Sequence, residues 1–234
     1  GQRIPDTLFG ALASIMPERI LASSNGACTT CMLFGRTEHS HGKYFICHES
    51  IAGGSGASHY FDGLSGVQVY LTNTSNMPIE ATEGEFPAIM LKKYVLRKDS
   101  GGAGEFRGGL GIWREYTVLN DNVAVNCFGD RQRFAPWGME GGLDGEPGAF
   151  YHISAETGAV TKLSAKTTGF PLKKGDIIRV FTPGAGGVGD PKKRPVEKVL
   201  QDVRENKVSR EAAETLYGVC ITEKENGQLD AVRI

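Results

Sequence analysis

Five neutral hydrogen-bonding side chains stand in a row at residues 72–76, which read Thr-Asn-Thr-Ser-Asn. The residues before them alternate between apolar and polar side chains, which predicts an extended strand over residues 66–73. Amides and hydroxyls at a strand end can hold a ligand by directional hydrogen bonds, without the desolvation cost of a buried ion. Such side chains also cap turns by bonding their own backbone, so a purely structural role stays open. The candidate ligand-contacting residues are Thr72, Asn73, Thr74 and Asn76, with Asn73 and Asn76 also expected to be catalytic.

Glu49 is the lone acid that the sequence favours for catalysis. It ends an apolar run over residues 42–50 and is followed by a loop that contains Gly53 and Gly54. A carboxylate beside such a loop can act as a general base for water or orient a bound metal. The two glycines would let the backbone approach a substrate closely. The alternative is a glutamate that accepts backbone N–H bonds from that loop.

Two arginines in glycine-rich loops are candidates for binding a phosphoryl group. Arg107 lies in Phe-Arg-Gly-Gly-Leu-Gly, and Arg131 lies in Gly-Asp-Arg-Gln-Arg-Phe. Guanidinium groups recognise phosphates through paired hydrogen bonds. An Asp–Arg pair that fixes neighbouring loops, or a subunit contact, is the alternative. No loop carries the G-x-x-x-x-G-K-[ST] pattern of a nucleotide-binding P-loop, so we expect no ATP site in this chain.

The cysteines allow a metal or redox interpretation. Cys28 and Cys31 have C-x-x-C spacing, and Cys47 and His48 follow, together with His39 and His41. Cys47 and His48 are adjacent in an expected strand, so their side chains should point to opposite faces and could not share one tetrahedral zinc site. Structural cysteines are therefore favoured over zinc or redox chemistry, and we assign no metal ligand.

The elements that position these residues are mainly strands. Runs rich in Val, Ile, Tyr and Phe predict strands, and 32 glycines cluster in the loops between them. The expected strands cover residues 42–50, 66–73, 88–97, 111–119, 122–128, 149–154, 160–165 and 176–182. An Asn-Asp-Asn turn predicts that the fourth and fifth of these runs form a β-hairpin.

Helices are expected mainly near the two ends of the chain. Residues 5–16 have helical spacing, with Asp6 as N-cap. Residues 196–206 and 209–218, the latter with Ser209 as N-cap, predict a helical hairpin. The fold class is thus α+β: a β-rich domain over residues 1–191, a helical hairpin over 192–220 and a polar, frayed tail over 221–234.

Composition excludes several classes of partner. Lys and Arg number 26 against 27 Asp and Glu, so no strong field would attract nucleic acid or an anionic membrane. No apolar run is long enough to span a bilayer, and no signal peptide is evident at the start. We therefore expect a cytoplasmic protein that binds neither nucleic acid nor membrane.

Ordered blocks along the chain resemble the hydantoinase B and oxoprolinase family. They are His-Glu-Ser-Ile-Ala-Gly-Gly-Ser-Gly-Ala and four longer runs that lie within residues 62–87, 96–116, 129–142 and 172–191. Residues 199–219 also resemble the end of such a chain. Complete members are more than twice as long, so the resemblance is to their carboxy-terminal part. Relatives in this family include 5-oxoprolinase, N-methylhydantoinase, caprolactamase and the acetone and acetophenone carboxylases.

The resemblance implies ATP-dependent hydrolysis of a cyclic amide by two components. A hydantoinase A-like ATPase subunit, holding ATP and Mg, would phosphorylate a carbonyl oxygen, and the B component would act on the activated small molecule. The amino-terminal half of the B component is the implied second partner and the implied place of any divalent metal. A ketone carboxylase subunit and a non-catalytic scaffold part of such a complex are the alternatives. Gln68 and Tyr70 stand where many members carry histidines, so the resemblance does not specify the substrate.

Overall fold

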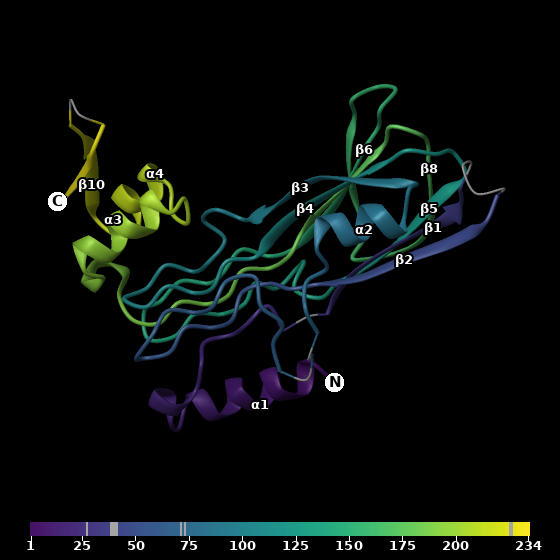
Figure 1. Cartoon of the computed structure of the whole chain (residues 1–234). Coiled ribbons are helices and arrows are strands. Elements are labelled where there is room, and N and C mark those ends of the chain that lie inside the picture. The colour runs from purple at the N-terminus through teal and green to yellow at the C-terminus, as the bar shows by residue number, and fades with distance from the viewer. Residues whose placement is uncertain (27, 38–41, 71, 73, 225–226) are drawn as a thin grey trace.

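The computed structural model describes residues 1–26, 28–37, 42–70, 72, 74–224 and 227–234. Three parts follow one another along its length: a β-sandwich, a layer of glycine-rich loops and a small C-terminal unit, with the first helix lying beneath the loops (Figure 1). The elements, in chain order, are α1 (Arg3–Ala13), η1 (Pro17–Arg19), β1 (Thr29–Arg36), β2 (Tyr44–Ile51), α2 (Ile79–Glu85), β3 (Ile89–Leu96), β4 (Ile112–Val118), β5 (Val123–Phe128), β6 (Ala149–Ile153), β7 (Val160–Leu163), β8 (Lys166–Leu172), β9 (Ile177–Phe181), η2 (Pro191–Lys193), α3 (Val196–Arg204), α4 (Arg210–Thr215), β10 (Val219–Glu223) and β11 (Leu229–Arg233). The α+β, strand-dominated class is confirmed.

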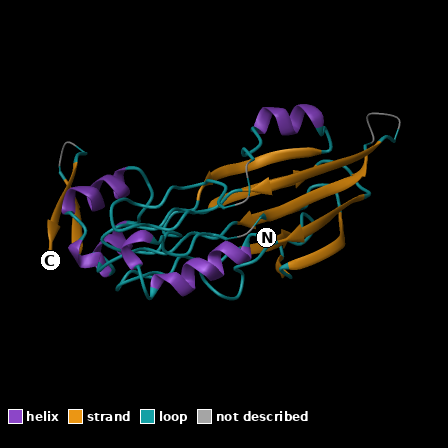
Figure 2. Cartoon of the chain, turned by 90° about the horizontal axis from the view of Figure 1, so that it is seen from below, coloured by secondary structure: helices purple, strands orange, loops and turns teal. Residues whose placement is uncertain are grey.

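The sandwich consists of two antiparallel sheets in the described part of the chain. One has the order β2-β1-β5-β8, and the other has the order β3-β4-β9-β6-β7. Alternate side chains of both sheets turn inward and form the main hydrophobic core, as period-two alternation requires. Viewed from below, the strands of the two sheets lie at one end of the molecule, and the C-terminal helices with their own pair of strands lie at the other (Figure 2).

Two sequence expectations about the strands are wrong. Residues 112–128 do not form a hairpin, because β4 pairs with β3 and β9 whereas β5 pairs with β1 and β8. The turn between them therefore carries the chain from one sheet to the other. The strand expected over residues 66–73 is also not formed: in its described part, Val67 makes a single bridge with Gly53, and Tyr70 has a left-handed φ of 57°. A left-handed residue interrupts an extended run, so the alternation there does not make a strand.

Between the sandwich and the C-terminal unit lies what we call the glycine layer, which comprises residues 21–26, 52–66, 100–111, 136–148 and 182–190. Its segments are neither helices nor named strands, yet they are joined by backbone hydrogen bonds. Gly186 shows the pattern: its N–H donates to Ser23 O at 2.8 Å, and its own carbonyl accepts from Ala57 N at 3.1 Å. Glycine is required because the segments approach so closely that a Cβ at Gly56 would lie 1.7 Å from Ala22 O.

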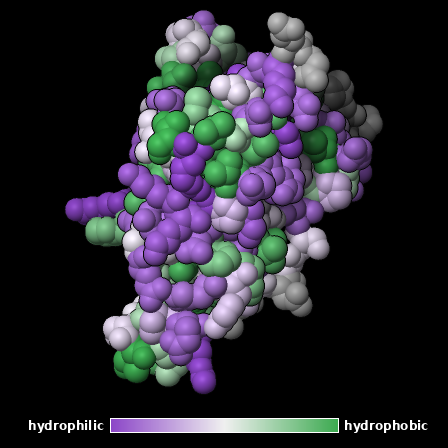
Figure 3. Space-filling model, turned by 90° about the vertical axis from the view of Figure 1, so that its left-hand side faces the viewer, coloured by the Kyte–Doolittle hydropathy of each residue, from purple (hydrophilic) through white to green (hydrophobic). Residues whose placement is uncertain are grey.

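The C-terminal unit packs α3 and α4 against a hairpin of β10 and β11. The helical hairpin is confirmed, and Ser209 caps α4 by accepting a hydrogen bond from Ala212 N. The tail expected to be frayed is instead this β-hairpin, because Ile221 and Ala231 pack on the small core of the unit. The end of the molecule that carries the C-terminal unit has a mostly hydrophilic surface with small clusters of hydrophobic residues (Figure 3). None of the helices in the described residues is long and apolar enough to cross a membrane.

Helix α1 begins at Arg3, earlier than an Asp6 cap would allow. Gln2 occupies the N-cap position, and Asp6 lies within the helix with 2% of its surface exposed. Its carboxylate binds Arg131, Ser23 Oγ at 3.0 Å and the hydroxyl of Tyr70 at 3.1 Å. Asp6 is therefore an anchor between α1 and the glycine layer, not a cap.

Candidate functional site

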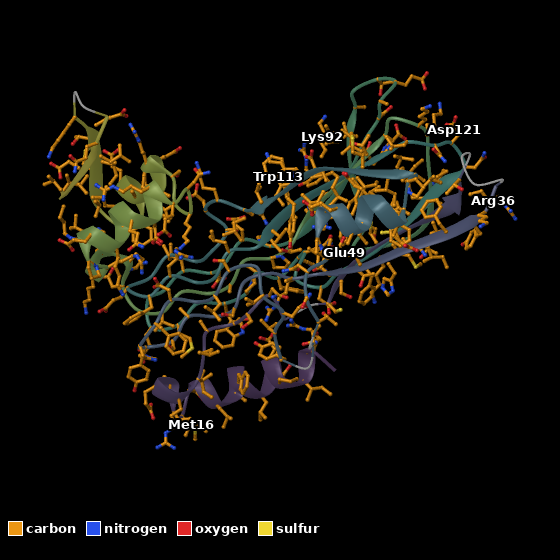
Figure 4. All side chains as sticks on the ribbon, in the orientation of Figure 1. Met16, Arg36, Glu49, Lys92, Trp113 and Asp121 are labelled. Atoms are coloured by element: carbon orange, nitrogen blue, oxygen red, sulfur yellow. The ribbon has the colours of Figure 1, made fainter. Side chains whose placement is uncertain are left out.

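Glu49 lies on β2 with its side chain inside the sandwich, and only 3% of the residue is exposed. Its Oε1 is 3.0 Å from Nη2 of Arg114, which reaches across from β4 in the opposite sheet. Tyr116, two residues further along β4 and on the same face, donates its hydroxyl hydrogen bond to Glu49 Oε2. Glu49 lies in the middle of the body, close to α2 (Figure 4). A carboxylate, a guanidinium and a phenol thus meet between the sheets.

Arg114 joins the buried group of Glu49, Arg114 and Tyr116 to the loop at Met77. It donates from Nη2 to Met77 O at 3.0 Å and from Nε to the Tyr116 hydroxyl at 3.1 Å. Its Cζ lies 4.2 Å from the ring centre of Tyr94. Nη1 of Arg114 is buried and makes no hydrogen bond within the described residues. The bonds to Met77 and Tyr116 fix the guanidinium next to Glu49, so the buried carboxylate has a cation beside it.

Burial controls the acidity of Glu49. Loss of hydration raises the pKa of its carboxyl group above the ordinary value, while the charge of Arg114 and the Tyr116 hydrogen bond lower it in part. A raised pKa makes a carboxylate a stronger proton acceptor. The environment is therefore suitable for a general base.

A cavity of about 380 Å³ opens next to Glu49. One side is formed by the end of β2, and the other by residues 74–78, which lead into α2. Its lining residues include His48, Glu49, Ser50, Thr74, Ser75 and Asn76. The volume lies within the range of small-molecule pockets. The wall contributed by residues 74–78 combines the hydroxyl groups of Thr74 and Ser75 with the apolar side chains of Met77 and Pro78.

The structure brings only part of the predicted polar set to this cavity. Thr74 is exposed at its wall, whereas both ends of the Asn76 amide are used within the chain: Oδ1 accepts from Ala52 N at 3.1 Å, and Nδ2 donates to Gly66 O at 2.9 Å. Thr72 accepts a hydrogen bond from the Gln2 side chain. Asn73 lies outside the described residues. Asn76 thus fixes the wall on which Thr74 stands.

Gly53 and Gly54 belong to the glycine layer. A Cβ at Gly53 would lie 2.7 Å from Pro183 O, and one at Gly54 would lie 2.1 Å from Gly109 O. Glycine is required at both positions because neighbouring backbone leaves no room for a Cβ.

Arg107 is enclosed by partners from the C-terminal unit. It is 3% exposed, its Nε donates to Asp202 Oδ2 at 3.3 Å, and the same oxygen accepts from Arg194 Nη2 at 2.8 Å. Arg194 also binds both carboxylate oxygens of Asp62 at 2.7 Å. These ion pairs join the glycine layer to α3. Arg107 is therefore not among the residues that line the Glu49 cavity.

Arg131 is also paired within the chain. Its Nη2 binds the Asp6 carboxylate and donates to Ser23 Oγ at 2.6 Å, and its Nη1 donates to Ala135 O at 2.9 Å. The Asp–Arg pairing considered as the alternative is therefore present for this residue, although its acid is Asp6 and not the neighbouring Asp130.

The cysteines are found where structural residues are expected. Cys31, Cys47 and Cys127 are buried between the sheets, and Cys28 donates from Sγ to Ser50 Oγ at 3.3 Å. Cys47 is buried while His48 is exposed, as the alternation predicts. No cluster of three His, Cys, Asp or Glu side chains suitable for a metal occurs among the described residues, and His39 and His41 lie outside them.

Arg114 and Tyr116 are the functional candidates that sequence reasoning missed. The sequence pattern does indicate their burial. In the run Ile112 to Val118, Arg114 and Tyr116 alternate in step with the apolar residues at the two ends, so both side chains should point into the sandwich. A charged side chain at an inward position requires a buried partner, and Glu49 is at an inward position of β2.

Comparison with known proteins gives a consistent assignment. The family model described as hydantoinase B/oxoprolinase matches residues 1–191. An uncharacterized protein of Methanocaldococcus jannaschii is 42% identical over 96% of this chain and 38% of its own. The B component of a putative D-/L-hydantoinase from a Pseudomonas species is 31% identical over 96% of this chain and 37% of its own.

A solved structure agrees with these sequence relatives. The ATP-dependent caprolactamase of Pseudomonas jessenii superposes with a TM-score of 0.80 at 29% identity, covering 94% of this chain and 38% of that one. The chain thus spans less than two fifths of the length of each of these relatives. With 191 of its 234 residues matched, the chain belongs to the hydantoinase B/oxoprolinase family.

Proposed function

We propose that this chain is the carboxy-terminal part of the B component of an ATP-dependent cyclic-amide hydrolase. The observation that carries the proposal is the likeness to the ATP-dependent caprolactamase, which extends over 94% of the chain at 29% identity. Caprolactam is a cyclic amide, and the hydantoinase relative is likewise named for a cyclic substrate. The shared chemistry is the opening of an amide ring.

The Glu49 cavity is the place in this chain where such a substrate would be handled. A partner ATPase transfers the γ-phosphoryl group of ATP to the amide oxygen, which makes the attached carbon more electrophilic. Water then adds to that carbon and gives its proton to the Glu49 carboxylate, which Arg114 and Tyr116 keep oriented. The C–N bond then breaks as the proton held by Glu49 passes to the nitrogen, which leaves an acyl phosphate. A second water attacks the phosphorus of that acyl phosphate and releases inorganic phosphate and the ring-opened carboxylate. Thr74, which lines the opposite wall, would donate a hydrogen bond to the ring substituents.

Two partners complete the proposed enzyme. A hydantoinase A-like ATPase supplies ATP and Mg, and the amino-terminal half of the B component supplies the remaining walls of the site and any divalent metal. The complex is proposed to work in the cytoplasm. This division agrees with the length of the relatives, of which this chain covers less than two fifths.

The test is reconstitution of the complex with defined variants. The chain is co-expressed with the partner ATPase and the amino-terminal part of the B component from the same source, and native mass spectrometry with metal analysis establishes the composition. ADP release and ring opening are then measured with hydantoin, 5-oxoproline and ε-caprolactam. Glu49→Gln is expected to lower kcat by about 10²-fold or more, since it removes the proton acceptor. Glu80→Gln, on the exposed side of α2, is the matched control and should leave kcat unchanged.

Thr74→Val guards against a folding artefact in the Glu49 variant. Thr74 is exposed, so its replacement should leave thermal unfolding unchanged while raising KM. Ring opening that needs ATP and is lost in Glu49→Gln supports the proposal. Consumption of bicarbonate with acetone, in place of ring opening, would assign the chain to a carboxylase. An assembled complex that is equally active with Glu49→Gln would leave this chain a scaffold.

A further inference from the structure

A second cavity, of about 420 Å³, lies away from Glu49 between the loop of residues 129–134 and residues 162–166, which comprise the end of β7, the turn after it and the start of β8. Gly129 N donates to Ala165 O at 3.0 Å and so joins the two segments. Neither segment takes part in the Glu49 cavity. Its size is suitable for a small ligand.

The cavity gathers positive charge that the chain does not neutralise. Arg133, Lys162 and Lys166 line it, and none of the three forms an ion pair with any residue in the described part of the chain. Arg131 is balanced by Asp6, which leaves Asp130 as the acidic side chain at the wall. In a protein whose net charge is −1, three unpaired cations around one hollow form a local excess of positive charge.

Two of these cations lie next to aromatic rings. The guanidinium of Arg133 lies 5.3 Å from the ring centre of Phe134, and the ammonium of Lys166 lies 5.5 Å from that of Phe128. Phe134 is 70% exposed and Phe128 is 45% exposed. The exposed ring of Phe134, which lines the cavity, provides an apolar edge for the body of a ligand whose charged end meets the cations.

The backbone of the same loop offers further hydrogen-bond donors. Arg131 has a left-handed φ of 54°, and its carbonyl accepts from Gly148 N at 2.9 Å, which fixes the bend. The N–H groups of residues 131–134 donate to no described residue. A left-handed residue in a loop with free N–H groups is a feature of backbone nests, which bind anions.

We propose that this cavity binds a small oxyanion, and that a phosphoryl group on an apolar body is its preferred form. A dianionic phosphoryl group matches the local excess of charge better than a carboxylate, because it carries more charge and one more oxygen for the free donors. The inference is independent of the proposed cyclic-amide chemistry, since it uses none of the groups around Glu49.

The experiment is a titration of the ¹⁵N-labelled chain with inorganic phosphate, at constant ionic strength and constant pH, followed by backbone amide chemical shifts. We expect saturable shifts that are largest at the amides of residues 131–134. Arg133→Gln should weaken binding about tenfold, the effect of losing one charge-assisted hydrogen bond. Lys193→Gln is the matched control, because Lys193 is an exposed lysine outside the cavity, and it should leave the affinity unchanged.

Each other outcome would overturn part of the proposal. Shifts that never saturate, or an equal loss of affinity in Lys193→Gln, would show diffuse charge attraction in place of a site. Acetate that binds as tightly as phosphate would overturn the phosphoryl preference and identify a carboxylate site. Thermal unfolding of the two variants is compared first, so that a misfolded protein is not counted as a loss of binding.

Discussion

Adding one methyl group within the glycine layer should damage the protein far more than adding the same group elsewhere. In Gly56→Ala the new Cβ would lie 1.7 Å from Ala22 O, so the two segments must separate by roughly 1 Å or more. That movement strains the hydrogen bonds from Ala22 N to Ala57 O and from Gly56 N to Ser24 Oγ, both 2.9 Å long. Overpacking costs about 1–3 kcal/mol, and each buried group left unpaired costs a similar amount. We therefore expect a loss of about 3–6 kcal/mol in the free energy of unfolding.

The matched control is Gly84→Ala in α2. Nothing lies within 4 Å of a Cβ at Gly84, and the residue is exposed. Alanine should there stabilise the helix by about 0.5–1 kcal/mol, because glycine has more backbone entropy to lose. Urea unfolding followed by circular dichroism measures both variants. If Gly56→Ala unfolds within about 1 kcal/mol of the original protein, with an unchanged dependence on urea, the close packing inferred for the layer is refuted.

Three further predictions concern the buried groups. Arg114→Met and Glu49→Leu should each lower the free energy of unfolding by about 3–5 kcal/mol, because each removes one member of the buried ion pair and leaves the other charged. The double variant should lose clearly less than the sum of the two single losses, as measured by urea unfolding. Additive losses would show that the pair is not coupled. Burial alone would raise the pKa of Asp62, but its hydrogen bonds with Arg194 and with the backbone N–H of Arg107, together with the charges of both arginines, lower that pKa. This carboxylate therefore contributes stability above its unfolded pKa, and that stability is lost as the pH falls through the lower folded pKa. Asp62→Asn should therefore destabilise the protein at about pH 6 and do so less at about pH 3, and a destabilisation that is equal at both would contradict this. Burial raises the pKa of the Cys47 thiol to about 12, so at about pH 8 Ellman's reagent should not label Cys47 in the folded protein and should label it once the protein is unfolded. Peptide mapping of the labelled chain measures this, and rapid labelling of Cys47 in the folded protein would refute it.

The strands could be predicted largely because alternation survives in the sequence. The runs at residues 88–97 and 176–182 correspond to β3 and β9 with small differences at the ends. Pairing could not be predicted from the same signal. The turn after Val118 looks like a hairpin locally, but β5 finds its partners in the other sheet, and partner choice depends on contacts that lie far apart in the sequence.

The candidate site shows the same limit. Glu49 could be identified from its position at the end of an apolar run, but its ion pair with Arg114 depends on how two sheets face one another. Arg107 and Arg131 could be recognised as anion binders by residue type, yet Asp202 and Asp6, which bind them, are 95 and 125 residues away in the chain. Residue type indicates what a side chain can bind, and only the fold determines whether an internal partner already occupies it.

The glycine layer has a further consequence for the heat capacity of unfolding. Exposing apolar groups raises that quantity, while exposing peptide groups lowers it. The layer buries hydrogen-bonded backbone with few side chains between its segments, so its unfolding exposes mainly peptide groups. The protein should therefore have a heat-capacity change per residue below the usual value of about 12–15 cal/mol/K. Its stability should then vary less steeply with temperature than that of a globular protein of equal size.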